Sequence, residues 1–290
     1  MTRLIVDSTC DLPEAQRTQF SIAVLPLSVT LEGRSYRDGV EIDLDRVYAA
    51  IRAGAALGTS QIRYEDTRAL FEETLRAGDD ALYLAFSSAM SGTMGLAAMV
   101  AEELLPQYPG RRIEIVDSRG GSMGSGLIAY QLGLMRDGGA DLDTLVERAK
   151  WMAQHTKYAF TVDDFSYAMK GGRVIARAAG TVGDILKIKP VMDVRDGMLH
   201  LVRFVGGSRR ALAAVADRVA DYAKNFKDQL IGVTHGDDAE RAKAMLRLLK
   251  ERLPDCTVLT QRIGSVLGSH LGTGGVGVFC LDQRPGGYSK

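Results

Sequence analysis

Hydroxyl side chains gather at two points of the sequence where a turn leads into a predicted helix. Residues 87–93 (SSAMSGT) follow an apolar run, and residues 58–61 (GTSQ) precede a helical pattern that begins near Tyr64. Amides at a helix N-terminus, together with Ser and Thr hydroxyls, form an anion site that needs neither lysine nor metal. Helix capping accounts equally well for each cluster taken alone. The two clusters together favour a convergent polar site.

A glycine-rich stretch, residues 263–279 (IGSVLGSHLGTGGVGVF), surrounds His270. Glycines let a backbone approach a ligand closely, and a histidine in such a loop can donate to a carboxylate or a phosphoryl oxygen. A purely structural histidine is the alternative. Gly272, Gly274 and Gly277 have the spacing of a dinucleotide fingerprint, but that motif must open a helix, and this one leads into an apolar strand. We therefore reject a dinucleotide site here.

Residues 120–124 (GGSMG) match the nucleophile-elbow pattern between a predicted strand and a predicted helix. An elbow needs its serine at the end of the strand, whereas residues 117–119 intervene before this turn. A serine hydrolase built on Ser122, with His235 or His270 as base and an unidentified acid, remains a less favoured alternative.

Metal and nucleotide sites have no support in the sequence. The four histidines, His155, His200, His235 and His270, are scattered without metal-ligand spacing. The glycine pair before Arg173 is not followed by the lysine and hydroxyl residue of a phosphate loop. We therefore expect no metal, no cofactor and no kinase activity residing in this chain alone.

Composition narrows the class of protein. With 290 residues the chain exceeds the usual size of a single core, so we expect two domains, 1–156 and 157–290, with a ligand site at or near their interface. Equal numbers of basic and acidic residues, 36 each, argue against a general nucleic-acid binder. The N-terminus lacks the pattern of a signal peptide, and no apolar run is long enough to span a membrane, so we expect a cytoplasmic protein.

The elements that must position these residues follow from apolar patterning. The first half alternates short apolar runs with helical patterns, which is typical of a mostly parallel sheet covered by helices. We expect strands at about residues 3–7, 22–31 (broken by Pro26), 81–86 and 112–117, and helices at about 43–53, 65–77, 93–105, 122–137 and 141–156.

The second half is less regular and predicts an α+β domain with antiparallel strands. The pair Asp196-Gly197 between two apolar runs is a strong hairpin signal. We expect strands near residues 158–162, 188–194, 199–205, 230–235, 256–260 and 276–281, and helices near 163–170, 208–224 and 238–252. The fold class is therefore α/β, with a parallel-sheet first half and an α+β second half.

Short motifs along the chain carry a family resemblance. They are residues 7–13 (DSTCDLP), 59–61 (TSQ), 87–93, 116–118 (VDS), 171–173 (GGR), 188–190 (IKP) and 268–272 (GSHLG). With these motifs in this order over nearly the whole chain, the sequence resembles the DegV family of bacterial fatty-acid-binding proteins.

The resemblance implies an acyl chain buried in a tunnel and a carboxylate held by hydroxyls and a histidine. At the matching positions, Thr59 or Ser60, Ser91 with the Gly92 amide, and His270 are the implied head-group contacts. The family implies that a partner ATP-dependent kinase, similar to dihydroxyacetone kinases, phosphorylates the bound fatty acid and that the acyl phosphate enters phospholipid synthesis. The chain itself would then be a non-catalytic subunit. A lipid carrier or sensor without phosphoryl transfer is the alternative.

The choice of the arginine in the implied site stays open, and the sequence differs from the family pattern at several positions. An arginine of the second domain assists in the family, and Arg203 is the implied equivalent here, with Arg209 as the alternative. Ile62 and Ser265 replace prolines of the family pattern, and Leu271 replaces a threonine after the histidine, which removes one hydroxyl contact with the head group. Thr273 then stands where the family has proline.

Overall fold

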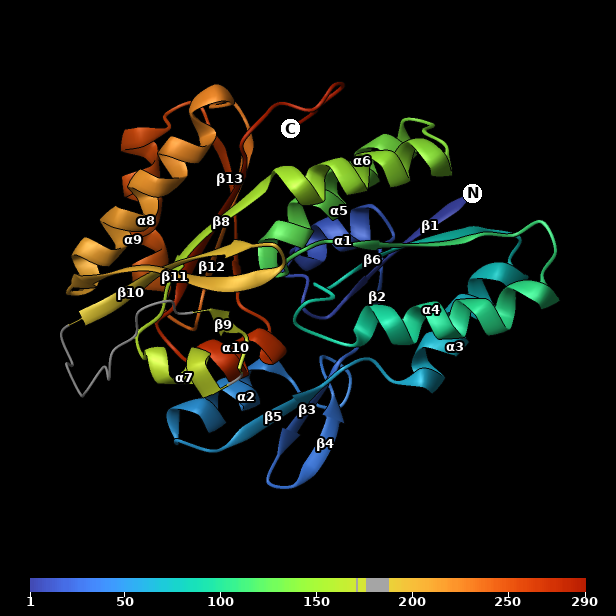
Figure 1. Ribbon diagram of the computed structural model, residues 1–290, viewed down its shortest axis with the longest axis horizontal. Coiled ribbons are helices and arrows are strands. Elements are labelled where there is room, and N and C mark those ends of the chain that lie inside the picture. Colours follow the sequence, from blue (N-terminus) through green and yellow to red (C-terminus); the bar gives the residue numbers. More distant parts are fainter. Residues whose placement is uncertain (171, 176–187) are drawn as a thin grey trace.

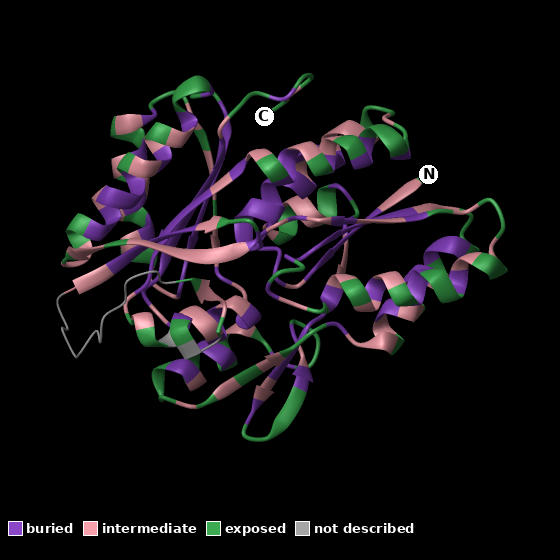
Figure 2. Cartoon of the chain, viewed as in Figure 1, coloured by how far each residue is buried: buried purple, intermediate pink, exposed green. Residues whose placement is uncertain are grey.

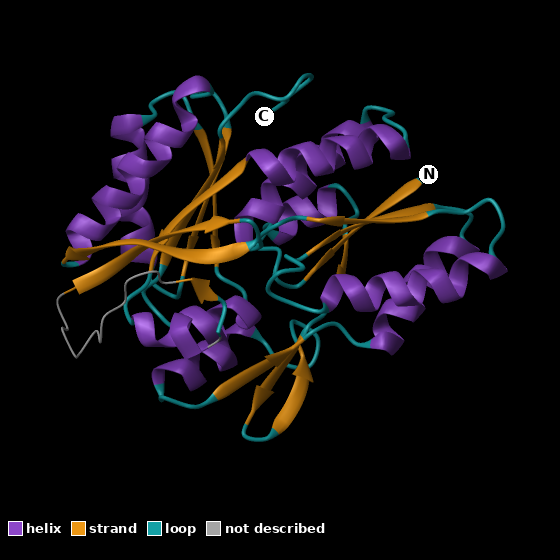
Figure 3. Ribbon diagram, in the orientation of Figure 1, coloured by secondary structure: helices purple, strands orange, loops and turns teal. Residues whose placement is uncertain are grey.

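The computed structural model describes residues 1–170, 172–175 and 188–290. Its strands form a four-stranded, a three-stranded and a seven-stranded sheet, and helices pack against them (Figure 1 and Figure 3). The strands of the first two sheets all lie before residue 118, and those of the third all begin at residue 156 or later. The predicted fold class, with a parallel sheet in the first half and antiparallel strands in the second, is confirmed.

The four-stranded sheet is parallel throughout and has the order β2-β1-β6-β7. Its strands are β1 (Thr2–Asp7), β2 (Ala23–Leu25), β6 (Asp80–Ala85) and β7 (Ile113–Asp117). Side chains alternate between the two faces of a strand. On β1, Leu4 and Val6 therefore join the core beneath α5 (Ser122–Asp137) and α6 (Leu142–His155), whereas Ile5 joins the core beneath α3 (Tyr64–Arg76) and α4 (Thr93–Leu104).

A small antiparallel sheet branches from this layer. It consists of β3 (Ser28–Leu31), β4 (Arg34–Arg37) and β5 (Leu57–Ser60), in the order β4-β3-β5. The predicted break at Pro26 is confirmed, because β2 before it and β3 after it belong to different sheets. Proline lacks an N–H for a strand ladder and stops the run there. The sequence patterns missed β4 and β5, as well as α1 (Glu14–Gln19), while the predicted helix near residues 43–53 is α2 (Leu44–Arg52).

The seven-stranded sheet has the order β13-β12-β14-β8-β10-β11-β9 and is mixed. Its inner pairs β12–β14, β14–β8, β8–β10 and β10–β11 are antiparallel. Helices α8 (Ser208–Tyr222) and α9 (Ala239–Arg252) cover one face, and α5 contacts β12 and β14 from the other. The strands are β8 (Thr156–Thr161), β9 (Val174–Ile175), β10 (Ile188–Arg195), β11 (Met198–Gly206), β12 (Leu230–His235), β13 (Thr257–Arg262) and β14 (Val276–Leu281).

The hairpin predicted at Asp196-Gly197 joins β10 to β11. Both turn residues have positive φ, 48° for Asp196 and 78° for Gly197. A two-residue turn with two positive φ values matches the twist of the flanking strands. The register continues through the opposed pair Arg195 and Met198, and this prediction is confirmed.

One apolar core joins the two halves of the chain. In Figure 2, buried residues occur along the central strands of both halves. It includes Leu4 of β1, Met123 of α5 and Phe279 of β14. Met123 packs so closely on β12 that a Cβ atom at Gly232 would lie 2.1 Å from its Cγ. Because this core is shared, the division into domains 1–156 and 157–290 remains a prediction.

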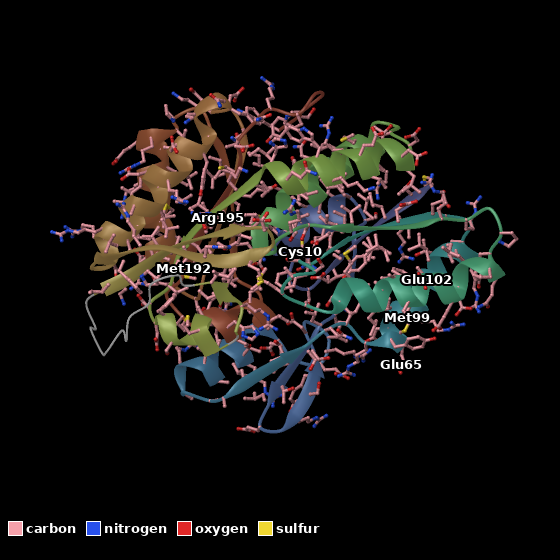
Figure 4. All side chains as sticks on the ribbon, viewed as in Figure 1. Cys10, Glu65, Met99, Glu102, Met192 and Arg195 are labelled. Carbon is pink, nitrogen blue, oxygen red and sulfur yellow. The ribbon has the colours of Figure 1, made fainter. Side chains whose placement is uncertain are left out.

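Figure 4 contrasts buried and exposed side chains on this frame. Cys10, near the centre of the view, and Met192, on β10, are buried, whereas Glu65, Met99 and Glu102 lie on the outer surface of α3 and α4. Within the ranges that the structure describes, no helix is both long and apolar enough to cross a membrane.

Candidate functional site

A cavity lies among the three sheets. Most of its wall is apolar. The lining residues include Phe160 of β8, Val194 of β10 and Phe279 of β14, together with Phe86, which directly follows β6. The wall suits a long apolar group.

Helix α10 (Ser265–Leu271) carries the histidine of this cavity. The expectation that His270 lies in a glycine-rich loop is therefore wrong. Gly268 is an interior residue of the helix, where a Cβ atom would lie 3.0 Å from the Tyr48 hydroxyl, so its glycine permits close packing. Gly272 ends the helix with φ of 73°, a conformation that favours glycine.

Thr59 and His270 meet at one end of the cavity. The Oγ1 atom of Thr59, on the edge strand β5, lies 2.7 Å from Nε2 of His270. Burial, reinforced by the positive charge of Arg173, lowers the pKa of His270 to about 4. The imidazole is therefore neutral near pH 7 and has one donor and one acceptor nitrogen. Ser60, the next residue on β5, also lines the cavity.

Arg173 is the residue that sequence reasoning missed. One of its guanidinium nitrogens, Nη1, lies 3.4 Å from Nε2 of His270, and its Nε donates to the carbonyl oxygen of Met90 at 2.8 Å. These contacts direct a positive charge to the polar end of the cavity. The motif at residues 171–173 gave a signal for it, although Gly171 itself lies outside the described residues.

Ser91 reaches the same cavity from the loop before α4. Its Oγ atom accepts from the Thr93 amide at 3.2 Å and lies 2.9 Å from the Thr93 hydroxyl, so the capping role and the cavity position coexist. Gly92 is exposed beside it. A Cβ atom at Gly92 would lie 2.3 Å from Oε1 of Gln61, so glycine lets the Gln61 side chain, another lining residue, lie over this loop.

Arg203 and Arg209 lie elsewhere. Arg203 is exposed on β11, opposite Val191, and is not among the residues that line the cavity. Arg209 is exposed in the first turn of α8. The structure thus brings Thr59, Ser60, Ser91 and His270 to one cavity but leaves both arginines on the surface.

Ser122 lines the cavity at a different point and does not have the surroundings of a hydrolase nucleophile. Its hydroxyl donates to the buried carboxylate of Asp11 at 2.5 Å and lies 3.2 Å from that of Thr234. His235 accepts from the Asp238 amide, and His270 pairs with Thr59. No histidine of the described residues is hydrogen-bonded to Ser122, although a nucleophile of this kind needs an adjacent base.

The arrangement therefore suits an amphiphile. Hydroxyls, a neutral histidine and an arginine can bind an anionic head, while the apolar wall accepts a long tail.

Comparison with known proteins agrees with this geometry. The model of the DegV family of uncharacterised proteins matches residues 1–283. A DegV domain-containing protein of Clostridium perfringens is 33% identical over 281 residues, which cover 96% of each chain. A counterpart from Mycobacterium tuberculosis is 35% identical over 283 residues, again covering 96% of each chain.

Two solved structures have the same fold. A DegV family protein from Thermus thermophilus, described for its fatty acid binding, has a TM-score of 0.85 at 28% identity, covering 96% of this chain and 98% of its own. A DegV lipid binding protein from Thermotoga maritima has a TM-score of 0.85 at 26% identity, covering 98% of this chain and 99% of its own.

Proposed function

Because this chain belongs to the DegV family, we propose that it binds a long-chain fatty acid in the cavity and presents the carboxylate to a partner kinase. The observation that carries the proposal is the polar cluster of Thr59, Ser91, Arg173 and His270 on an otherwise mostly apolar cavity. The fatty-acid-binding relative from Thermus thermophilus supports it.

The head group would lie between β5, α10 and the loop before α4. Thr59 or Ser60, Ser91 and the Gly92 amide supply donors, and the neutral His270 adds one more. The guanidinium of Arg173 supplies the opposing charge. Hydrogen bonds to a charged group stabilise a complex by about 1.5–3 kcal/mol each, so this end fixes the orientation of the ligand.

The tail would supply most of the affinity. Burial of apolar surface stabilises by about 0.8 kcal/mol for each CH₂ group. An acyl chain that enters the cavity can reach Phe160 and Phe279, which lie on the seven-stranded sheet. The ligand would thus contact both proposed domains, 1–156 and 157–290.

Exposure of the head-group end supports a role in presenting the carboxylate. Ser60, Gln61 and Gly92 are exposed, whereas Thr234 and Phe279 farther along the cavity are buried. A carboxylate held at the surface is accessible to a second protein. The exposed Arg203 is our candidate for contact with that partner, an ATP-dependent kinase similar to dihydroxyacetone kinases, which would form the acyl phosphate for phospholipid synthesis. This assignment would make the chain a cytoplasmic, non-catalytic subunit.

Native mass spectrometry of the purified protein, followed by denaturation and lipid identification, tests binding. We expect one fatty acid for each chain. His270→Gln should weaken binding at least tenfold, since it alters a contact with a charged group. His200→Gln is the matched control, because His200 lies on β11 and is not among the lining residues. A wild-type chain that stays empty after incubation with varied fatty acids would refute the proposal.

A separate experiment tests the kinase partnership. The loaded protein is incubated with ATP and a candidate kinase, and hydroxylamine traps any acyl phosphate as a hydroxamate. Transfer of the γ-phosphoryl group from ATP to a carboxylate oxygen releases ADP, so both products should appear together. Binding without either product in the presence of an ATP-dependent kinase similar to dihydroxyacetone kinases would favour the alternative of a carrier or sensor.

A further inference from the structure

Strand β14 lines the cavity with a glycine and a phenylalanine that are two residues apart. Gly277 and Phe279 are both lining residues. They lie on the same face of the strand, because successive side chains point to opposite faces. A Cβ atom at Gly277 would lie 2.9 Å from Cζ of Phe279 and 3.1 Å from its Cε2 atom. The ring of Phe279 therefore extends along β14 and covers the place that a side chain at position 277 would occupy.

The neighbouring strands leave this ring little room to move sideways. Phe279 is opposite Tyr158 of β8 on one side and Gly232 of β12 on the other. Its ring packs edge-on against Tyr158, with the ring centroids 5.5 Å apart and the planes at 86°. Met123 of α5 packs over Gly232, where a Cβ atom would also lie 3.5 Å from Cδ2 of Phe279. A ring that moves away from Gly277 must therefore enter the cavity.

The ring lies where it would meet the tail of a ligand. Phe279 belongs to the core beneath α5, together with Tyr158 and Met123. The head-group residues lie on β5, on α10 and in the loop before α4. A displaced ring would thus narrow the apolar part of the cavity rather than its polar end.

We propose that Gly277 determines how long a tail the cavity accepts, because it lets the Phe279 ring lie along the sheet and outside the path of the acyl chain. The inference rests on the proposed function, since it takes the ligand to be a fatty acid with its carboxylate at His270. With glycine at position 277 the cavity accepts long-chain acids. A side chain at this position would push the ring into the cavity and exclude the end of a long tail, whereas a medium-chain acid would still fit.

The alternative is that glycine at position 277 only permits close packing of β14. A purely structural role predicts that Gly277→Ala weakens the binding of all fatty acids by the same factor. A role in selecting the tail predicts a loss that grows with tail length, because only a long tail has to pass the ring. Each buried CH₂ group contributes about fourfold to affinity, so a tail that loses roughly two of them binds about tenfold more weakly.

Competition native mass spectrometry tests the role of Gly277. The delipidated protein is incubated with equal amounts of dodecanoic and octadecanoic acid, and the ratio of bound octadecanoic to bound dodecanoic acid is measured. We expect the wild type to favour octadecanoic acid. Gly277→Ala should lower the ratio about tenfold. Adding Phe279→Leu to this variant should restore most of the ratio, because the smaller side chain no longer has to enter the cavity. Gly95→Ala, the same substitution at an exposed position of α4, should leave the ratio unchanged.

A second variant keeps the test decisive if Gly277→Ala fails to fold. Phe279→Trp introduces a larger ring, which cannot lie within the same bounds over Gly277 and should also lower the ratio. A wild type that binds neither acid overturns the proposed function and this inference with it. A wild type that favours dodecanoic acid overturns the inference alone, and so does a ratio that neither Gly277→Ala nor Phe279→Trp changes.

Discussion

At the scale of single residues, two side chains at the head-group end have different roles, one as a neutral hydrogen-bond donor and the other as a positive charge. His270 has a pKa lowered to about 4 by burial and by the charge of Arg173, so it is neutral near pH 7. A neutral imidazole can donate one hydrogen bond to a carboxylate but cannot balance its charge. The guanidinium of Arg173, whose Nη1 atom lies 3.4 Å from Nε2 of His270, supplies that charge. A carboxylate held in this way should bind with little dependence on the ionisation of His270 above pH 6.

Asp11 is the buried acid that links the cavity wall to α10. Its carboxylate accepts from the Ser122 hydroxyl and from the Gly264 amide. Burial raises the pKa of Asp11 from 3.8 to about 7, although these two hydrogen bonds oppose the rise. The folded state therefore binds a proton more tightly at this side chain than the unfolded state does.

This raised pKa predicts a loss of stability as the pH rises. The contribution of Asp11 is fully present below the unfolded pKa of about 4 and is lost as the pH rises through the folded value near 7. Between pH 5 and 7 the free energy of unfolding should fall by about 2 kcal/mol through this group. Urea unfolding of the wild type and of Asp11→Asn at the two pH values measures this fall in the free energy of unfolding. An equal pH dependence in both proteins would contradict the assignment.

The sequence motifs located most of the polar residues of the cavity but did not predict the hydrogen bonds that they form. Thr59, Ser60, Ser91 and His270 line one cavity, as a convergent polar site requires. Arg173 was missed because it lies in a short irregular segment. Apolar periodicity indicates the buried side of a helix or strand, but it does not show which way a side chain points in such a segment. The Asp11 contacts were missed for a related reason, since Ser122 and Gly264 lie 111 and 253 residues away along the chain.

At the scale of elements, α10 runs from the Asp11 carboxylate, which accepts from its N-cap Gly264, to His270 at the head-group end of the cavity. It contacts α2, α7 (Phe165–Lys170) and β5, and its close packing depends on Gly268. A Cβ atom there would lie 3.0 Å from Oη of Tyr48 and 3.2 Å from its Cζ atom. The ring has little freedom to move, because Tyr48 is fully buried and donates to the Ile263 carbonyl at 3.0 Å.

Gly268→Ala should therefore destabilise the protein despite the higher helix propensity of alanine. Overpacking of a tight core contact is destabilising by about 1–3 kcal/mol. Gly95→Ala in α4 is the matched control, since a Cβ atom there meets nothing within 4 Å. The control should gain about 0.5–1 kcal/mol from helix propensity. Thermal unfolding measures the midpoint temperature of each variant relative to the wild type. Equal shifts of the same sign would contradict the close packing of α10 at Gly268.

Long periodic helices were predictable from the sequence, whereas the short helices α1 and α10 were not. Helices α5 and α8 have 16 and 15 residues, enough for an apolar stripe to define them. Helix α10 has seven residues, Gly268 inside it and Gly264 and Gly272 at its ends, so its local propensity is that of a loop. Tertiary packing against Tyr48 and the small sheet determines its helical state.

At the scale of the whole molecule, contacts between the two halves surround the cavity. The hairpin tip after β10 meets the loop after β6, where the Ser87 hydroxyl donates to the Gly197 carbonyl at 2.8 Å. Arg119 and Asp196 form an ion pair nearby, which is exposed and contributes little. The core shared by α5, β12 and β14 closes the far side. A ligand in the cavity would therefore be one more contact between the halves.

Fatty-acid binding should consequently stabilise the whole chain. A ligand that binds only the folded state adds about 2.7 kcal/mol to the free energy of unfolding at one hundred times its dissociation constant. Trp151, the single tryptophan, reports on α6 in the first half, and far-UV circular dichroism reports on both halves. Hexadecanoic acid should shift the urea midpoint of both signals equally.

Hexadecan-1-ol, which has the same tail without a carboxylate, should give a smaller shift at the same concentration. A shift in only one signal would mean that the ligand contacts one half alone, and equal shifts for acid and alcohol would mean that the polar cluster does not bind the carboxylate.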